Sequence, residues 1–378
     1  MKIAMIQDDW WPQVGGGPIH VRELAISLAE AFGHEIDIYT RKLRDDGVTH
    51  TAVETYAGGD VRVLRRGPTA AYHNPLGRLA SMVSLVPFGH LSEYDLVHGH
   101  TYLPAVPTKI ADYLSDAPTV FTIHGTTLNS GVGLSHSELR NKIERRLERA
   151  FILGFDYDHV VSVNREHLDM LADAHDSVSY VPNGIDVDRF EPDGETKSGR
   201  LLYLGRLARE KRVVDIVESM PTIVDAHPDA ELVVVGTGPE RERLEDRAAQ
   251  LGVTDSVEFA GRVSDEAVVE YYSSAQLFVL PSIWEGHPLT LLEAWASETP
   301  VIASDTEGIA EFVEDGTNGR LIEPKNVDDI ASTVIELLDA PEERRTYATA
   351  GRELVESEYT WRATAERTNE VYQTVETR

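Results

Sequence analysis

The chain has 378 residues, no cysteine and a hydrophobic fraction of 42%, which is enough for a buried core and excludes wholesale disorder, disulfide frameworks and cysteine chemistry. Its 35 basic and 64 acidic residues leave a formal net charge of −29, which argues against binding to nucleic acid because that needs a cationic surface. Only 7 of the basic residues are lysines. This excess of carboxylates predicts a halophilic protein, since concentrated salt screens self-repulsion.

The length predicts two or three domains, and the first half of the chain alternates strands with helices. Predicted strands cover residues 2–7, 35–40, 61–64, 95–98, 119–124, 160–163 and 178–181. A glycine-rich turn at 15–17 follows the first strand, and apolar residues then recur at helical spacing up to Phe32. Alternation of this kind predicts an α/β fold with a parallel sheet and helices on both faces.

The same pattern restarts in the second half, after a polar segment at 192–199 that is typical of a linker. Strands are predicted at 200–204, 231–235, 257–259, 277–280 and 301–303, and helices at 213–225, 240–251, 265–273 and 288–297. We therefore predict two Rossmann-like doubly wound domains, 1–182 and 183–360, with a C-terminal helix at 361–378 packing back across the hinge. Because ligands bind beyond the carboxyl ends of such strands, the domains should face each other across a cleft.

The most informative segment is 279–305, where a strand leads into a loop with Glu285 and then into a helix with Glu293. Backbone N–H groups at a helix start bind anions. Two carboxylates in the dry wall of a cleft need hydrogen-bond partners. Sugar and ribose hydroxyls are suitable partners, and solvent or salt bridges are the alternative.

This segment resembles the Glu-x7-Glu signature of the retaining glycosyltransferases of family 4, group 1 type, which have the GT-B fold. The resemblance spans nearly the whole chain, because other motifs occur in the same order: Gly15-Gly16, His124, Pro182-Asn183-Gly184-Ile185-Asp186, Gly205-Arg206-Leu207 with Glu210-Lys211, and Gly236-Thr237-Gly238-Pro239. It implies transfer of a hexose-type sugar from a nucleotide-diphosphate donor to a hydroxyl of a glycan, glycolipid or other acceptor.

The resemblance also implies roles for single residues. Arg206 and Lys211 would clamp the donor diphosphate, because a guanidinium fork and an ammonium both neutralise phosphate oxygens. Glu293 would accept the ribose hydroxyls, and Glu285 would contact the sugar ring with the amides of residues 286–289 nearby. Arg212 replaces the glycine that usually follows the lysine in this family.

Four further positions are assigned in the same way. By resemblance, His124 approaches the donor sugar, and Gly15 and Gly16 let the loop backbone reach the diphosphate. Arg262 would lie beside the base and phosphates. The donor-binding stretch at the start of the helix that carries Glu293 contains Gly286, His287, Pro288 and Leu289. Position 287 is histidine where many members of the family have phenylalanine.

His98 and His100 suggest a metal site with His124 as third ligand, because three imidazoles can bind zinc. The sequence shows no compelling carboxylate ligand to complete such a site, and the family that the chain resembles needs no Asp-x-Asp metal site. We therefore expect no metal and no cofactor other than the nucleotide-sugar co-substrate.

Three other functions stay open. A GT-B nucleotide-sugar epimerase or phosphorylase would share the fold, and a sensor would bind the donor without turnover. An NAD-dependent oxidoreductase would explain Gly236-Thr237-Gly238, although Arg241 stands where its fingerprint needs a third glycine.

Residues 137–150 are the most basic stretch of the acidic chain. Interleaved glutamates favour a solvated amphipathic helix, and weak peripheral contact with a membrane or a lipid-linked acceptor is the alternative. No apolar run approaches the roughly 18–20 residues of a membrane span, and the acidic N-terminus is not a signal peptide. We expect a cytoplasmic protein, with the inner face of the membrane as its site if acceptors are lipid-linked.

Overall fold

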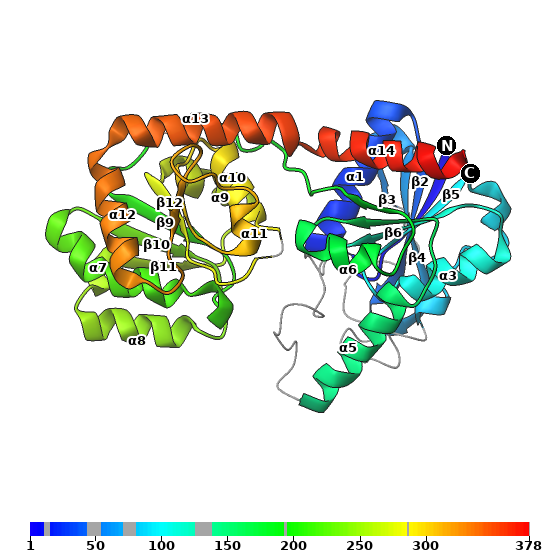
Figure 1. Cartoon of the computed structure of the whole chain (residues 1–378), viewed down its shortest axis with the longest axis horizontal. Coiled ribbons are helices and arrows are strands. Elements are labelled where there is room, and N and C mark those ends of the chain that lie inside the picture. The colour runs from blue at the N-terminus through cyan, green and yellow to red at the C-terminus, as the bar shows by residue number, and fades with distance from the viewer. Residues whose placement is uncertain are drawn as a thin grey trace. The chain divides into compact units, whose positions relative to one another are not determined.

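The computed structural model describes residues 1–10, 16–43, 54–70, 81–124, 138–192, 195–285 and 287–377. The chain divides into two compact units (Figure 1). Unit 1 comprises Met1–Gly184 with Trp361–Arg378, and unit 2 comprises Ile185–Thr360. The polar segment at 192–199 lies inside unit 2, so the prediction that it links the domains is wrong. Its backbone is held there, because the Lys197 amide donates to the Ser274 carbonyl and the Gly199 amide to Gln276 Oε1.

In the described part of unit 1, eight strands form one sheet in the order β3-β4-β2-β1-β5-β6-β7-β8. Neighbouring strands are parallel except the antiparallel pair β3–β4. The strands are β1 Lys2–Ile6, β2 Glu35–Leu43, β3 Glu54–Tyr56, β4 Val61–Ala70, β5 Leu96–His100, β6 Thr119–Ile123, β7 His159–Ser162 and β8 Val178–Tyr180.

Both faces of this sheet are covered, which explains why its central strands are continuous apolar runs. Alternate residues of β1 enter different clusters: Ile3 packs in one with helices α1 and α14, and Ala4 packs in another on the opposite face. Figure 1 shows α14 alongside α1. The helices are α1 Gly16–Phe32, α3 Ala105–Leu114, α5 Glu138–Leu153, α6 Leu168–Ala172 and α14 Trp361–Glu376, with 3-10 turns η1 Ala57–Gly59, η2 Leu91–Glu93 and η3 Arg165–His167.

Unit 2 has a six-stranded sheet in its described residues, in the order β11-β10-β9-β12-β13-β14 with parallel neighbours throughout. The strands are β9 Arg200–Leu204, β10 Glu231–Val235, β11 Val257–Gly261, β12 Leu277–Leu280, β13 Val301–Ser304 and β14 Arg320–Ile322. The helical elements are η4 Arg209–Lys211, α7 Val213–Ala226, α8 Arg241–Leu251, η5 Thr254–Ser256, α9 Asp265–Ser274, α10 Leu289–Ala296, α11 Glu307–Ala310, α12 Val327–Asp339 and α13 Pro341–Glu358.

Local signals in the sequence set several helix ends of unit 2. Ser264 caps α9, because its side chain accepts from the Ala267 amide, and Gly252 ends α8 with a φ of 73°. Pro341 stands in the first turn of α13, where its missing N–H costs nothing. Among the described helices, none combines the length and the apolar character needed to cross a bilayer.

Candidate active site

The strand ends of β9 and β12 bring the predicted donor residues of unit 2 together. These strands are parallel neighbours, with Leu201 opposite Leu277, so the loops that follow them leave the same edge of the sheet. The first loop carries Arg206 and Lys211, and the second carries Glu285. A backbone hydrogen bond of 3.0 Å from the Ile283 amide to the Glu210 carbonyl joins the two loops.

Lys211 and Glu285 form an ion pair, with 2.6 Å between Nζ and Oε2. The other carboxylate oxygen of Glu285 accepts a hydrogen bond of 2.7 Å from Ser282 Oγ. The side chains of Lys211 and Glu285 are only 20% and 10% exposed, so both charges are held in place by surrounding protein. The pair presents a lysine ammonium at the carboxyl edge of the sheet.

Arg206 is more open, with a side chain 69% exposed and an ion pair of 2.6 Å to Glu210. Each of the two cations expected to clamp a diphosphate therefore already contacts a carboxylate. The resemblance implied a cationic clamp formed by Arg206 and Lys211. The structure instead shows a balanced group in which Glu210 and Glu285 neutralise Arg206 and Lys211.

Glu293 projects from α10 and accepts a hydrogen bond of 2.8 Å from the Tyr272 hydroxyl. Burial raises the pKa of this carboxyl to about 7, against the opposing effect of the Tyr272 hydrogen bond. A carboxyl with such a pKa changes charge near neutrality. It can therefore accept hydrogen bonds strongly only above that pH.

The start of α10 offers fewer free amides than the sequence suggested. The Leu289 amide donates to the His287 carbonyl at 3.0 Å, and the Leu291 amide donates to Pro288. Pro288 has no N–H of its own, and Gly286 lies outside the described residues. The His287 ring packs edge-on against Phe312 with 5.1 Å between centroids, so this side chain has a packing role within unit 2.

Two glycines of the β10 loop are needed for packing between loops. A Cβ on Gly236 would lie 1.9 Å from the Gly205 carbonyl oxygen, and one on Gly238 would lie 2.2 Å from that of Leu207. These close approaches hold the β10 loop against the β9 loop and leave no room for a side chain at either position. Packing therefore accounts for both glycines, and binding of a dinucleotide is not needed to explain them. Arg262 is exposed after β11, two strands away from β9 in the sheet.

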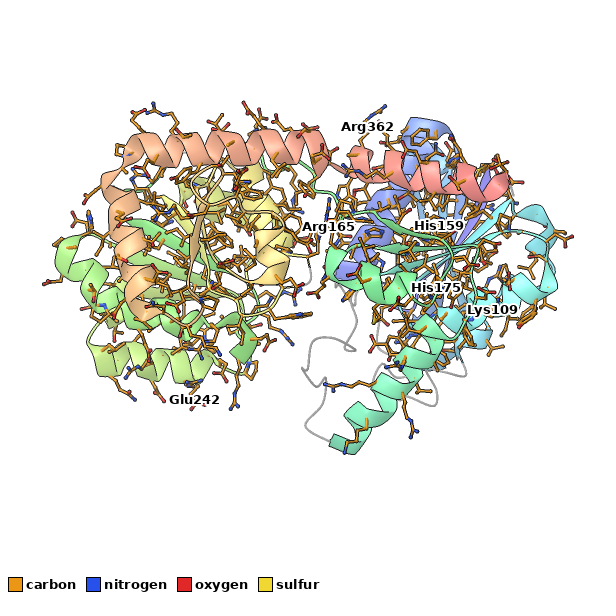
Figure 2. The ribbon with its side chains drawn as sticks, viewed as in Figure 1. Lys109, His159, Arg165, His175, Glu242 and Arg362 are labelled. Carbon is orange, nitrogen blue, oxygen red and sulfur yellow. The ribbon has the colours of Figure 1, made fainter. Side chains whose placement is uncertain are left out.

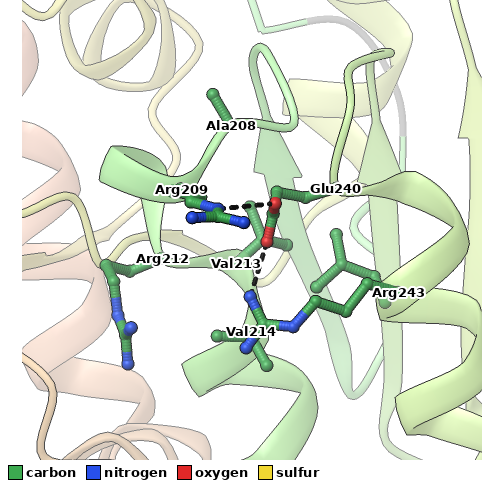
Figure 3. A pocket seen from close by; sticks show the side chains of 8 residues that line it. Ala208, Arg209, Arg212, Val213, Val214, Glu240 and Arg243 are labelled. Atoms are coloured by element: carbon green, nitrogen blue, oxygen red, sulfur yellow. Dashed lines mark hydrogen bonds and ion pairs between the residues drawn. The ribbon is translucent and has the colours of Figure 1, made fainter. Parts of the chain in front are cut away.

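A pocket of about 340 Å³ lies beside the same β9 loop but does not include Lys211, Glu285 or Glu293. Figure 3 shows that Glu240 lies between two of its arginines, contacting Arg209 at 3.3 Å and Arg243 at 2.6 Å. The pocket is lined by Ala208, Arg209, Arg212, Val213, Val214, Glu240, Arg243 and Leu244. Its third arginine, Arg212, pairs with Asp215 outside the pocket, so three guanidinium groups share two carboxylates here.

Unit 1 places His124 directly after β6, at the carboxyl edge of its sheet. Gly16 begins α1, and a Cβ added to it would have no other atom within 4 Å. Packing therefore does not require a glycine at this position. Gly15 lies outside the described residues. Thr101, directly after β5, has a φ of 66°, which is strained for a β-branched residue and marks this edge as unusual.

Sequence reasoning missed His20, which α1 places against His124 with 4.4 Å between ring centroids. Its Nδ1 donates to Oδ1 of Asn183 at 2.7 Å. The only signal for His20 was its place one turn after the glycine loop. His98, which the sequence offered only as a ligand of a metal site that we did not expect, bonds Tyr372 and Thr122, both at 2.7 Å.

Two α/β units, each built on a largely parallel sheet, are the architecture of the GT-B fold. The family model "Glycosyltransferase Family 4" matches residues 14–189, and the family model "Glycosyl transferases group 1" matches residues 185–354. The chain belongs to this glycosyltransferase family and is a glycosyltransferase.

Individual relatives agree with this assignment. An uncharacterized glycosyltransferase of Methanocaldococcus jannaschii is 28% identical, with 98% of each chain covered. The structure of sucrose-phosphate synthase from Thermosynechococcus elongatus is 26% identical with a TM-score of 0.83, covering 99% of this chain and 98% of that one. HepE of Anabaena, solved with UDP-glucose, shares the fold at 19% identity and a TM-score of 0.74, covering 99% of this chain and 100% of that one.

Proposed function

We propose that the protein is a retaining glycosyltransferase that moves a hexose-type sugar from a nucleoside-diphosphate donor to a hydroxyl group of a glycan, glycolipid or other acceptor. The observation that carries the proposal is the Lys211–Glu285 ion pair at the adjacent ends of β9 and β12. Its support among relatives is the Anabaena HepE structure, which was solved in complex with UDP-glucose.

Donor binding would redistribute the charges of the β9 loop. The ammonium of Lys211 and the exposed guanidinium of Arg206 would donate hydrogen bonds to the diphosphate oxygens. Without the donor, these two groups contact Glu285 and Glu210. Both contacts with the diphosphate would be charge-assisted hydrogen bonds, which are stronger than neutral ones. Glu293, in its ionised form, would accept the ribose hydroxyls while Tyr272 orients it.

The transfer step breaks the bond between the anomeric carbon and the diphosphate oxygen. The acceptor oxygen then bonds to the same face of that carbon, and its proton passes to the departing phosphate. Negative charge grows on the diphosphate, so fixed cations beside it stabilise the transition state. Lys211 and Arg206 supply that charge, and we propose that the transfer itself needs no metal ion.

A panel of UDP- and GDP-sugars would test the proposal by thermal shift and by release of the nucleotide. One nucleotide family should raise the melting temperature of the wild type and of Lys197→Ala, in which an exposed lysine of the same unit is removed. Lys211→Ala should lose most of that shift. NMR of the product should show the anomeric configuration of the donor sugar; the inverted anomer would contradict retention, and an epimerised donor without transfer would favour an epimerase.

Weak peripheral contact with an anionic membrane belongs to the same proposal. The α5 helix carries exposed Lys142, Arg146 and Arg149, with Leu147 41% exposed among them. Basic residues attract anionic lipid at low salt, whereas the net charge of −29 opposes binding. Sedimentation with phosphatidylserine vesicles should show binding at low salt that is lost in Arg146→Glu; equal binding by the variant would contradict a role for α5.

A further inference from the structure

Three histidine rings of unit 1 meet at the carboxyl edge of its sheet. His20 comes from α1, His100 is the last residue of β5, and His124 follows β6. One ring nitrogen of each residue lies within 4.8 Å of one ring nitrogen of the other two. The three side chains therefore come from separate elements that the fold brings together.

The spacing of these nitrogens is close to that of a metal site. His100 Nδ1 and His124 Nε2 lie 3.3 Å apart. Two imidazole nitrogens on one tetrahedral zinc are separated by about 3.3–3.4 Å, because each Zn–N bond is about 2.0–2.1 Å long. The third nitrogen needs to approach by at most about 1.4 Å, which a small rotation of a side chain supplies.

Two of the rings carry nitrogens that lack a hydrogen-bond partner in the part of the chain that the structure describes. His20 Nε2 and His100 Nε2 are buried in this way, and the residues are 2% and 0% exposed. A buried polar atom without a partner normally costs free energy, so such atoms call for an explanation. A bound cation would satisfy His20 Nε2; it would not reach His100 Nε2, because His100 would bind it through Nδ1, the nitrogen that faces His124.

The protonation state of His20 fits the role of a ligand. Its Nδ1 hydrogen is held by Asn183 Oδ1 at 2.7 Å, so Nε2 carries the lone pair, and this arrangement is the usual outer-shell support of a metal-bound histidine. Burial lowers the pKa of His20 to about 4 and holds that of His100 well below its ordinary value.

Other buried histidines of unit 1 form no such group, although His167 and His175 also keep ring nitrogens without a hydrogen-bond partner among the described residues. His98 bonds Tyr372 and Thr122 through its two nitrogens. His175, labelled in Figure 2, donates Nε2–H to the Ile152 carbonyl at 2.7 Å, and His159 Nε2 lies 2.9 Å from Ser179 Oγ. These contacts tie loops and strands together. The group formed by His20, His100 and His124 differs because its rings converge on one another.

We propose that His20, His100 and His124 form a binding site for a divalent transition metal of the zinc type, with a fourth position open to water or a small ligand. Three neutral imidazoles with an open position are a recognised donor set for zinc. The site departs from the three histidines that the sequence suggested, because His20 takes the place of His98. It does not depend on the proposed transfer chemistry.

Titration of the chelator-treated full chain with Zn²⁺ by calorimetry tests this site, and Co²⁺ titration reports its geometry through visible absorption. We expect one tight equivalent and the intense bands of tetrahedral Co²⁺. His20→Asn and His124→Gln should each weaken that equivalent at least about tenfold, since even outer-shell changes cost about 10–100-fold. His90→Asn is the control, because it removes an exposed histidine that contacts Glu93.

Circular dichroism of each variant establishes that it is folded. The proposal is overturned if the wild type binds no tight equivalent of Zn²⁺. This result does not depend on whether any variant folds. It is equally overturned if folded His20→Asn and His124→Gln keep the wild-type affinity, or if His90→Asn loses as much. Measured transferase activity bears on none of these outcomes, so failure here leaves the proposed function untouched.

Discussion

Replacing Lys211 by alanine separates its proposed catalytic role from its structural one. Lys211 Nζ is 2.6 Å from Glu285 Oε2, and both side chains are mostly buried. Without the lysine, Glu285 keeps its hydrogen bond from Ser282 but loses its cation. Breaking a fully buried pair costs about 3–5 kcal/mol. Since these side chains retain some exposure, we expect a loss of about 1–2 kcal/mol in the free energy of unfolding.

The expected effect on activity is larger. Removing one fixed donor to a developing negative charge costs about 2.7–4 kcal/mol, or roughly 10²–10³-fold in turnover. Nucleotide release in a coupled assay measures turnover, and urea unfolding measures stability. The double variant Lys211→Ala/Glu285→Gln should recover stability, because no unpaired carboxylate remains, while turnover stays low. Wild-type turnover in Lys211→Ala would refute the reasoning.

Four further predictions follow from particular contacts. Glu210→Gln should tighten the binding of a nucleoside diphosphate several-fold by freeing Arg206; unchanged affinity in calorimetry would contradict this. Burial raises the pKa of Glu293 in the folded protein to about 7, so ionisation of this carboxyl destabilises the fold. As pH rises from about 4.5 to about 7, the melting temperature should therefore fall more steeply in the wild type than in Glu293→Gln. Parallel curves for the two proteins would contradict this prediction. Gly351→Ala should destabilise unit 2 by about 1–3 kcal/mol in urea unfolding, because the added Cβ would lie 2.1 Å from Trp295 Cδ1. The cost of this overlap should exceed the gain of about 1 kcal/mol in helix propensity. A more stable variant would show that the two helices move apart freely. The melting temperature should rise with KCl concentration, since the net charge of −29 repels itself less in salt; a flat or falling curve is the opposing result.

Most strands could be predicted because they are short, continuous apolar runs bounded by glycine or polar residues. The segment 200–204, for example, is β9 in the structure. The strand β3 was missed because Glu54–Tyr56 is only three residues long and partly exposed. The helices α12 and α13 were also missed, although Asn326 and Pro341 are ordinary helix-start signals.

The candidate site was predictable in part. Glu285, Glu293 and Lys211 stood out because charged residues after apolar strands belong to the ligand edge of a parallel sheet. Their partners were not predictable. Nothing in the local sequence shows that Lys211 contacts Glu285, since 74 residues separate them. The pairing of Glu293 with Tyr272 depends in the same way on how α9 and α10 pack.

The amino-acid sequence by itself determined the fold class, the family and the edge of each sheet that carries polar residues, because periodicity and motif order are local properties of the chain. The tertiary structure alone decided which charges neutralise each other and which histidines meet. His20 and His124 are 104 positions apart yet their rings are in contact. Such contacts depend on the packing of α1 against the strand ends, and no local pattern encodes the distance between two elements.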